Sequence, residues 1–208
     1  GHSVAVEGDV VLVGSYKACD DPGTWGCTSH GTVYAFRTDG TLLQKMYPSS
    51  GSADRNDEFG KSVSIFGNYI AIGAPQDGGF STATKGYVQI YKKHNNTHWN
   101  LHRQLDGVST SASDDPKFGS SVSVGSTHVV IGSPAYRKST GEKDVGRARL
   151  YKLEDGSLVK SFTATDGDEN HNFGAAVKIS GNFVAVSAPG SDAVKLNSRR
   201  LLGNVLGS

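Results

Sequence analysis

Hydrophobic and polar positions alternate in short stretches that recur along the chain. The dipeptide Phe-Gly stands at residues 59–60, 118–119 and 173–174, and Gly1 occupies the place of the second residue in a further copy. Three and five residues after each of these glycines comes Val or Ile, with a small or polar residue between them. A period of two predicts a β-strand with one buried face, so each copy begins with such a strand.

A tight turn and a second strand follow in every copy. The turns are Gly8-Asp9, Gly67-Asn68, Ser126-Thr127 and Gly181-Asn182. Glycine accepts positive φ, so we expect the Ser-Thr turn, which has none, to be the least regular. The second strands are nearly continuous apolar runs, which indicates burial on both faces, and they end in small residues that usually include proline. These runs begin at residues 10, 69, 128 and 183.

Two more strands complete each copy. The third strand begins at a glycine, over residues 31–36, 86–91 and 146–151, and the fourth covers residues 42–46, 99–105 and 158–162. Four antiparallel strands repeated head to tail predict an all-β fold, a β-propeller of four-stranded antiparallel blades. We assign blade 1 to residues 1–58, blade 2 to 59–117, blade 3 to 118–172 and a partial blade 4 to 173–208.

The last copy is shorter than the others. Counting its third strand from Gly203 leaves no residues for a fourth strand. Because open sheet edges are a liability, we expect three complete blades and one partial blade of a larger ring. The remaining blades would come from the rest of the same chain or from another chain.

These motifs resemble the FG-GAP repeats of the integrin α-chain propeller and of many surface proteins. The resemblance covers almost the whole chain, and the second copy carries the pattern intact. The residues that carry it are Phe59, Gly60, Gly73, Ala74, Pro75, Phe118, Gly119, Gly132, Pro134, Phe173, Gly174 and Pro189. Integrin repeats often hold calcium in an Asp-rich loop between the first two strands. Here a two-residue turn occupies that place and is too short for six or more oxygen ligands, so we expect no metal site and no cofactor.

The composition argues against nucleic acid and membranes as partners and bears on the cellular location. With 21 basic and 20 acidic residues, the chain lacks the positive field that attracts nucleic acid, and no apolar run is long enough to insert into a membrane. Cys19 and Cys27 could form a disulfide in one loop, or remain two free thiols. Asn95 begins a glycosylation sequon in a polar hairpin. The cysteine pair and the sequon together favour the secretory pathway and an extracellular or cell-surface location.

Several clusters resemble catalytic or ligand sites without the required context. His94, His98 and His102 are spaced for a metal-binding helix, but the local alternation is that of a strand. Residues 60–62 imitate the end of a phosphate-binding loop, but Arg55 stands where its first glycine is required. The acidic residues before each Phe-Gly could act as paired catalytic carboxylates, but their recurrence favours structural turns. They are Asp54, Asp57, Glu58, Asp114, Asp115, Asp166, Asp168 and Glu169.

The sequence therefore favours a non-catalytic interaction or adhesion scaffold whose loops contact other proteins or matrix. The loops are residues 16–30, 76–85 and 135–145. One alternative is a glycan-binding propeller with Trp25, Tyr136 and Asn56 on its rim. Another is the accessory propeller of a larger secreted enzyme. The basic residues Lys195, Arg199 and Arg200 are either a solvated rim or a site for a sulfated glycan or acidic partner.

Overall fold

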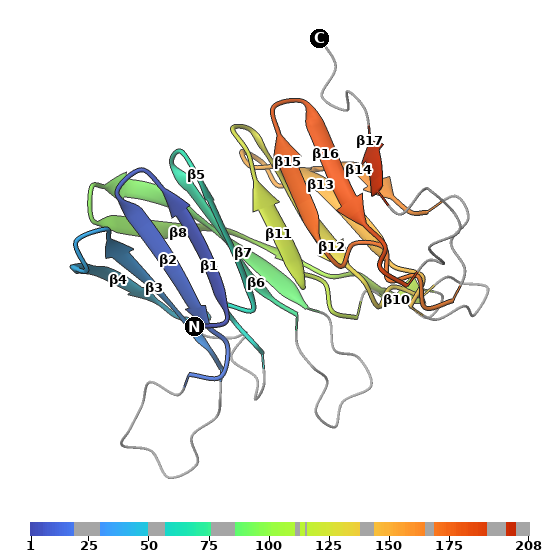
Figure 1. The fold of residues 1–208 in the computed structure, drawn as a ribbon, viewed down its shortest axis with the longest axis horizontal. Helices are drawn as coiled ribbons and strands as arrows, with labels where there is room; N and C mark the ends of the chain where they lie inside the picture. The colour runs from blue at the N-terminus through green and yellow to red at the C-terminus, as the bar shows by residue number, and fades with distance from the viewer. Residues whose placement is uncertain are drawn as a thin grey trace.

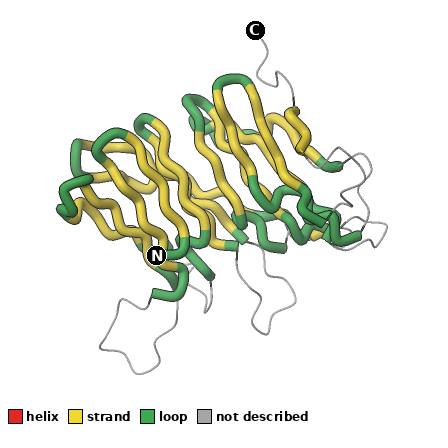
Figure 2. Tube along the Cα trace, in the orientation of Figure 1, coloured by secondary structure: helices red, strands yellow, loops and turns green. Residues whose placement is uncertain are grey.

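A computed structural model of the chain contains strands and turns, with no helix in the part that it describes (Figures 1 and 2). The described residues are 1–18, 30–49, 57–75, 86–110, 113–114, 116–137, 144–164, 169–190 and 199–202. Among them there is no helix that could cross a membrane.

The strands form four antiparallel meanders and one small hairpin. The first sheet contains β1 Ser3–Glu7, β2 Val10–Ser15, β3 Thr32–Arg37 and β4 Leu42–Met46. The second contains β5 Ser62–Phe66, β6 Tyr69–Ala74, β7 Tyr87–Asn95 and β8 His98–Asp106. The third contains β11 Ser121–Val124, β12 His128–Ser133, β13 Arg147–Lys152 and β14 Leu158–Phe162. The fourth contains β15 Val177–Ser180, β16 Phe183–Ser187 and β17 Arg199–Leu202. The hairpin pairs β9 Ser109–Thr110 with β10 Ser113–Asp114.

The repeat pattern correctly predicted the strands of the first three sheets, and each sheet lies within the residue range assigned to its blade. The β9–β10 hairpin in the connection to the third sheet was not predicted. Gly8, Gly67 and Gly181 have φ near +55° in their turns. In the third sheet the ladder instead ends at the pair Val124–Val129, and the amide of Gly125 donates to the carbonyl of His128 at 2.8 Å.

The expected third strand of the last blade is wrong. It was counted from Gly203, but β17 begins at Arg199, which pairs with Ser187. Ser187 corresponds to Gly132 of the third sheet, which pairs with Ala148, so Arg199 and Ala148 are equivalent. Glycine was the anchor of the count, and the register shows that this blade reaches its third strand several residues earlier. Arg199 and Arg200 therefore belong to a strand, whereas Lys195 lies outside the described residues.

The sheets stack face to face along the chain (Figure 1). The first strands of neighbouring sheets contact one another, β1 with β5, β5 with β11 and β11 with β15. Each space between two sheets holds one hydrophobic core, built from both. We call the face of a sheet that packs on the preceding sheet its leading face, and the opposite one its trailing face.

Alternating residues of the inner strands divide between these faces. In the second sheet, Ile70 and Ile72 of β6 belong to the core shared with the first sheet, whereas Ala71 belongs to the core shared with the third. This explains why the second strands of the middle sheets are apolar on both faces, as predicted. The Phe of each Phe-Gly is buried in the same cores, with Phe59 and Phe118 fully covered.

The same set of polar contacts joins the sheets at all three boundaries. The hydroxyl of Ser3 donates to the carbonyl of Gly60 at 2.8 Å, and Ser62 and Ser121 bond in the same way to Gly119 and Gly174, at 2.7 and 2.8 Å. The serine pairs within its own sheet with a glycine of the second strand, which is Gly14, Gly73 and Gly132 in turn. We call the serine, its paired glycine and the next Phe-Gly carbonyl the clamp.

The clamp requires glycine in its second strand because the next blade approaches so closely. A Cβ added to Gly73 would lie 2.1 Å from the carbonyl oxygen of Gly119, and one added to Gly132 would lie 2.0 Å from that of Gly174. The glycine of Phe-Gly has a different constraint. Gly60, Gly119 and Gly174 have φ of +85°, +93° and +94°, a left-handed conformation that side chains disfavour. The motif thus combines a buried ring with a backbone turn that presents its carbonyl to the preceding sheet.

Candidate functional site

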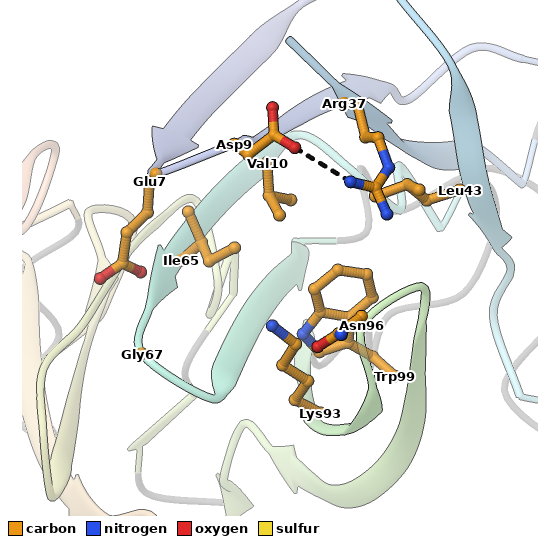
Figure 3. A pocket seen from close by; sticks show the side chains of 11 residues that line it. Glu7, Asp9, Val10, Arg37, Leu43, Ile65, Gly67, Lys93, Asn96 and Trp99 are labelled. Carbon is orange, nitrogen blue, oxygen red and sulfur yellow. Dashed lines mark hydrogen bonds and ion pairs between the residues drawn. The ribbon is translucent and has the colours of Figure 1, made fainter. Parts of the chain in front are cut away.

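A groove of about 400 Å³ lies between the hairpin ends of the first two sheets (Figure 3). The first sheet contributes the β1–β2 turn and the ends of β3 and β4, and the second contributes the β5–β6 turn and the β7–β8 hairpin. Its lining residues are Glu7, Gly8, Asp9, Val10, Arg37, Leu43, Ile65, Gly67, Lys93, Asn96 and Trp99. The long connections between second and third strands attach at the opposite end of the sheets, since Ser15 pairs with Thr32 there.

Charged groups occupy the first-sheet side of the groove. Oδ2 of Asp9 forms an ion pair with Nη1 of Arg37 at 3.1 Å, and Oδ1 accepts hydrogen bonds from the hydroxyl and the backbone amide of Thr38. These Thr38 bonds, followed by the charge of Arg37, lower the pKa of Asp9 below its ordinary value. Asp9 therefore stays ionised near neutral pH, which suits a hydrogen-bond acceptor better than a proton donor.

Trp99 forms the floor on the second-sheet side. Trp99 is 1% exposed, and its backbone is held to the first sheet by the side-chain amide of Gln44: the Trp99 N–H donates to Oε1 at 2.7 Å, and Nε2 donates to the Trp99 carbonyl at 2.9 Å. The ammonium of Lys93 lies 5.9 Å from the Trp99 ring centroid. Within the described part of the chain, neither Nε1 of Trp99 nor Oε2 of Glu7 has a hydrogen-bond partner, although both atoms are buried.

A buried indole N–H and a buried carboxylate oxygen without partners are costly, and such groups are usually satisfied by water or a ligand. The groove also offers cations at Lys93 and Arg37 and an apolar surface at Val10, Leu43 and Ile65. A ligand with hydroxyl groups and an apolar face matches this combination. Within the described residues, no group of three or more His, Cys, Asp or Glu side chains is arranged to hold a metal ion.

The predicted rim residues lie elsewhere or outside the described residues. Tyr136 is partly exposed, and the guanidinium of Arg147 lies 3.8 Å from its ring centroid, so one ring face is already covered. Trp25, Asn56, Cys19 and Cys27 lie outside the described residues, so the rim and disulfide predictions stay predictions.

The sequon lies on the exposed β7–β8 hairpin. Oδ1 of Asn95 accepts hydrogen bonds from the amide and hydroxyl of Thr97, at 2.9 and 3.1 Å. Asn96, the next residue, lines the groove. The side chain of Asn95 is solvent-exposed, as an acceptor for a glycan must be. Its modification remains a prediction.

Two residues of the clusters that imitated catalytic sites, His102 and Lys61, make contacts within the fold. His94, His98 and His102 lie on the β7–β8 hairpin, and not on a helix, as expected; a ring nitrogen of His102 bonds the carbonyl of Leu153 at 3.2 Å. Lys61 of the phosphate-loop imitation lies over the ring of Tyr16 at 3.9 Å and pairs with Glu58 at 3.1 Å.

The acidic segment before the second blade contains a buried carboxylate. Asp57 is 0% exposed and accepts a hydrogen bond from the hydroxyl of Tyr87 at 2.9 Å. The expected role of Asp57 was a turn residue that accepts backbone hydrogen bonds, and the structure adds a side-chain partner. Asp114 lies on β10, Glu169 is exposed, and Asp54, Asp115, Asp166 and Asp168 lie outside the described residues.

Tyr87 makes the free energy of unfolding depend on pH in the alkaline range. Burial, with the charge of Asp57 beside it, raises the pKa of Tyr87 far above its ordinary value of 10.0. The folded state therefore keeps a proton that the unfolded state loses above pH 10, so this contribution is complete below that pH and is lost as pH rises. We expect Tyr87→Phe to remove up to about 1.4 kcal/mol per pH unit from the decline in stability above pH 10. Urea unfolding of both proteins from neutral pH to about pH 11 measures the difference in slope; parallel curves would contradict it.

Comparison with known proteins supports the same architecture. A family model described as FG-GAP repeat matches residues 41–91 and 157–201. A search of curated proteins finds no match. The matched segments include the Phe-Gly and Gly-Ala-Pro motifs of the second blade and the Phe-Gly of the fourth, whose structures place them at the boundaries between sheets. The chain therefore contains FG-GAP repeats, and its four-stranded antiparallel sheets have the form of β-propeller blades.

Proposed function

We propose that the protein is a non-catalytic interaction scaffold of the extracellular or cell-surface type, which contacts other proteins or matrix. FG-GAP repeats form propeller domains that mediate protein interactions, and they are typical of surface proteins. The observation that carries the proposal is the repeated clamp, which joins successive blades by identical bonds. A stack locked in this way holds connecting loops of different length in fixed positions, as recognition requires.

The scaffold proposal is tested by binding of the purified protein to immobilised fibronectin, laminin and collagen, measured by surface plasmon resonance. We expect saturable binding to at least one of them. The binding should fall when residues 137–143, between β12 and β13, are replaced by a Gly-Ser linker of equal length. Replacement of the turn residues Ser126 and Thr127 by Asn and Gly is the control, since that turn lies at the other end of the sheet. Absence of binding to all three, or equal loss in both variants, would contradict the proposal.

A second candidate function is glycan binding in the groove between the first two blades. The specific observation is the pair of buried, unpartnered groups, Nε1 of Trp99 and Oε2 of Glu7, beside an apolar wall. Sugars supply both a hydroxyl acceptor for the indole and a hydroxyl donor for the carboxylate. In this proposal the groove, and not the predicted rim of Trp25, Tyr136 and Asn56, makes the contacts.

Substitutions at the groove test this second function on a glycan array followed by calorimetry with the strongest ligand. We expect Lys93→Ala and Trp99→Phe each to weaken that ligand by about tenfold, because each removes one hydrogen-bond donor. Lys92→Ala is the matched control, since the adjacent Lys92 points to the other face, over the ring of Tyr69. A ligand whose affinity changes equally in all three variants, or an array without binding, would contradict glycan recognition in the groove.

A further inference from the structure

The fourth blade carries different residues at the clamp positions. Ser187 holds the position of Gly14, Gly73 and Gly132, next to the Val177–Val186 pair, and its amide donates to the carbonyl of Ala176, which stands in place of serine, at 2.9 Å. The hydroxyl of Ser187 accepts the backbone amide of Ala176 at 2.9 Å. The alanine cannot donate to a further Phe-Gly carbonyl. In addition, Ser187 carries a Cβ where the other three sheets have glycine. In those sheets an added Cβ would lie only about 2 Å from the carbonyl oxygen of the next Phe-Gly motif.

A third difference lies on β15, two residues after Ala176. Ser64 and Ser123 are buried on the trailing faces of the second and third sheets, where their hydroxyls accept the amides of Val124 and Ile179, at 3.0 and 3.1 Å. The equivalent residue of the fourth sheet is Lys178, which is exposed, and that of the first sheet is Ala5. Burying an unpaired lysine under another sheet would cost far more than burying serine or alanine.

The opposite end of the stack has no such obstacle. Val4 and Val6 on the leading face of the first sheet are 73% and 68% exposed. The equivalent residues of the second sheet, Val63 and Ile65, pack in the core shared with the first sheet. The same positions are filled by Val122 and Val124 at the next boundary. The leading face of the first sheet thus repeats an apolar surface that three other boundaries of this chain cover with a blade.

We propose that blade docking in this protein is directional. The leading face of β1–β4 receives the trailing face of an FG-GAP blade that carries glycine in its second strand and a small residue in its first. The trailing face of β15 and β16 does not receive a blade in the clamp geometry. Ala176 lacks the hydroxyl that donates to the next blade, Lys178 places a charge on the face, and the side chain of Ser187 occupies the space that glycine leaves for the next carbonyl. Copies of this chain therefore do not join head to tail. This inference goes beyond the proposed function, and neither depends on the other.

The effect of these three residues on blade docking is tested by placing them in the third sheet of the full chain, at its boundary with the fourth. The variant Ser121→Ala, Ser123→Lys, Gly132→Ser gives the third sheet the residues of the fourth. We expect at least tenfold faster hydrogen exchange at the amides of Phe173 and Ile179, which bond across that boundary, with β5–β8 unchanged. Ser180→Lys is the control, because it adds a lysine to β15 outside the clamp positions and should leave these amides protected.

Two outcomes of this experiment overturn the inference. One is unchanged protection of Phe173 and Ile179 in the triple variant. If the triple variant does not fold, Ser123→Lys alone decides, and it is read at Phe173 because Ile179 loses its own acceptor in that variant: a tenfold faster exchange of Phe173 supports the inference, and normal protection overturns it.

The reverse change tests the direction of docking. The full-chain variant Ala176→Ser, Lys178→Ser, Ser187→Gly restores the clamp residues to the fourth sheet. In sedimentation equilibrium we expect concentration-dependent association of this variant, loss of that association when Val4→Glu is added, and no such association of the natural chain. Association of the natural chain that Val4→Glu removes would overturn the inference. A restored variant that is folded by circular dichroism but remains unassociated would overturn it as well.

Discussion

Substitution of Gly73 by Ala is expected to destabilise the protein by about 3 kcal/mol, at the upper end of what overpacking usually costs. The added Cβ would lie 2.1 Å from the carbonyl oxygen of Gly119 and 2.3 Å from the hydroxyl of Ser62. The serine can rotate, but the carbonyl belongs to the backbone of the next blade. It cannot move without disturbing the buried Phe118 beside it. Urea unfolding followed by tryptophan fluorescence measures the change.

The fourth blade supplies a matched control for this prediction. Ser187 already carries a side chain at the equivalent position, so Ser187→Ala introduces no overlap and removes one hydrogen bond to the amide of Ala176. That substitution should cost only about 1 kcal/mol. Equal effects of Gly73→Ala and Ser187→Ala would show that the close approach of successive blades is not what requires glycine.

Substitution of Phe118 by Ala is expected to destabilise the protein by about 3 to 5 kcal/mol. The Phe118 ring is fully buried between the second and third blades and contacts the ring of Tyr151 edge-on, with centroids 6.2 Å apart. Its loss leaves a cavity that the clamp on both sides prevents from collapsing. Thermal and urea unfolding should both show the loss, and exchange of β11 and β15 amides should show which boundary opens first.

Phe66→Ala is the control for ring size. Phe66 ends β5 at a hairpin turn and is 46% exposed, so its removal should cost less than about 1.5 kcal/mol. If the two phenylalanine substitutions had similar effects, the recurrence of Phe-Gly in this chain would reflect something other than burial between blades.

The repeat predicted most of the fold because its signals are local. Alternation identified β1, β5, β11 and β15, and the tight turns identified the strands that follow them. The fourth strands of the first and third sheets match residue for residue the predicted ranges 42–46 and 158–162. A period of two and a two-residue turn restrict the backbone over a few residues, so the chain itself specifies them wherever they occur.

Two features could not be predicted in the same way. The clamp joins residues 53 to 57 positions apart, and nothing in the alternation of Ser62 and its neighbours distinguishes a hydroxyl that bonds the next blade from one that faces water. The recurrence of Ser3, Ser62 and Ser121 was the available signal, together with its loss at Ala176. The groove draws its residues from hairpins of two different blades, and only the packing of those blades brings Glu7 and Trp99 to the lining of one groove.

The wrong start of the last third strand has a physical reason. Glycine is needed where the third strand passes the Phe-Gly carbonyl of a following blade, as at Gly31, where an added Cβ would lie 2.0 Å from the carbonyl of Phe59. The sequence count assumed that this need applies to every copy. In the fourth blade the pairing of β17 with β16 sets the register instead, so β17 begins at Arg199, four residues before Gly203.

The most direct test of the interlocked blades is native-state hydrogen exchange of amides that bond across a boundary. Phe59 donates to the carbonyl of His30 at 3.0 Å, Phe173 donates to that of Val145 at 3.1 Å, and Val124 donates to the hydroxyl of Ser64 at 3.0 Å. If the blades form one locked stack, all three amides exchange only through global unfolding, with the same free energy as the ladder amides of β6 and β12. Exchange of these amides at the rate of an unfolded chain, while the ladders stay protected, would contradict the account.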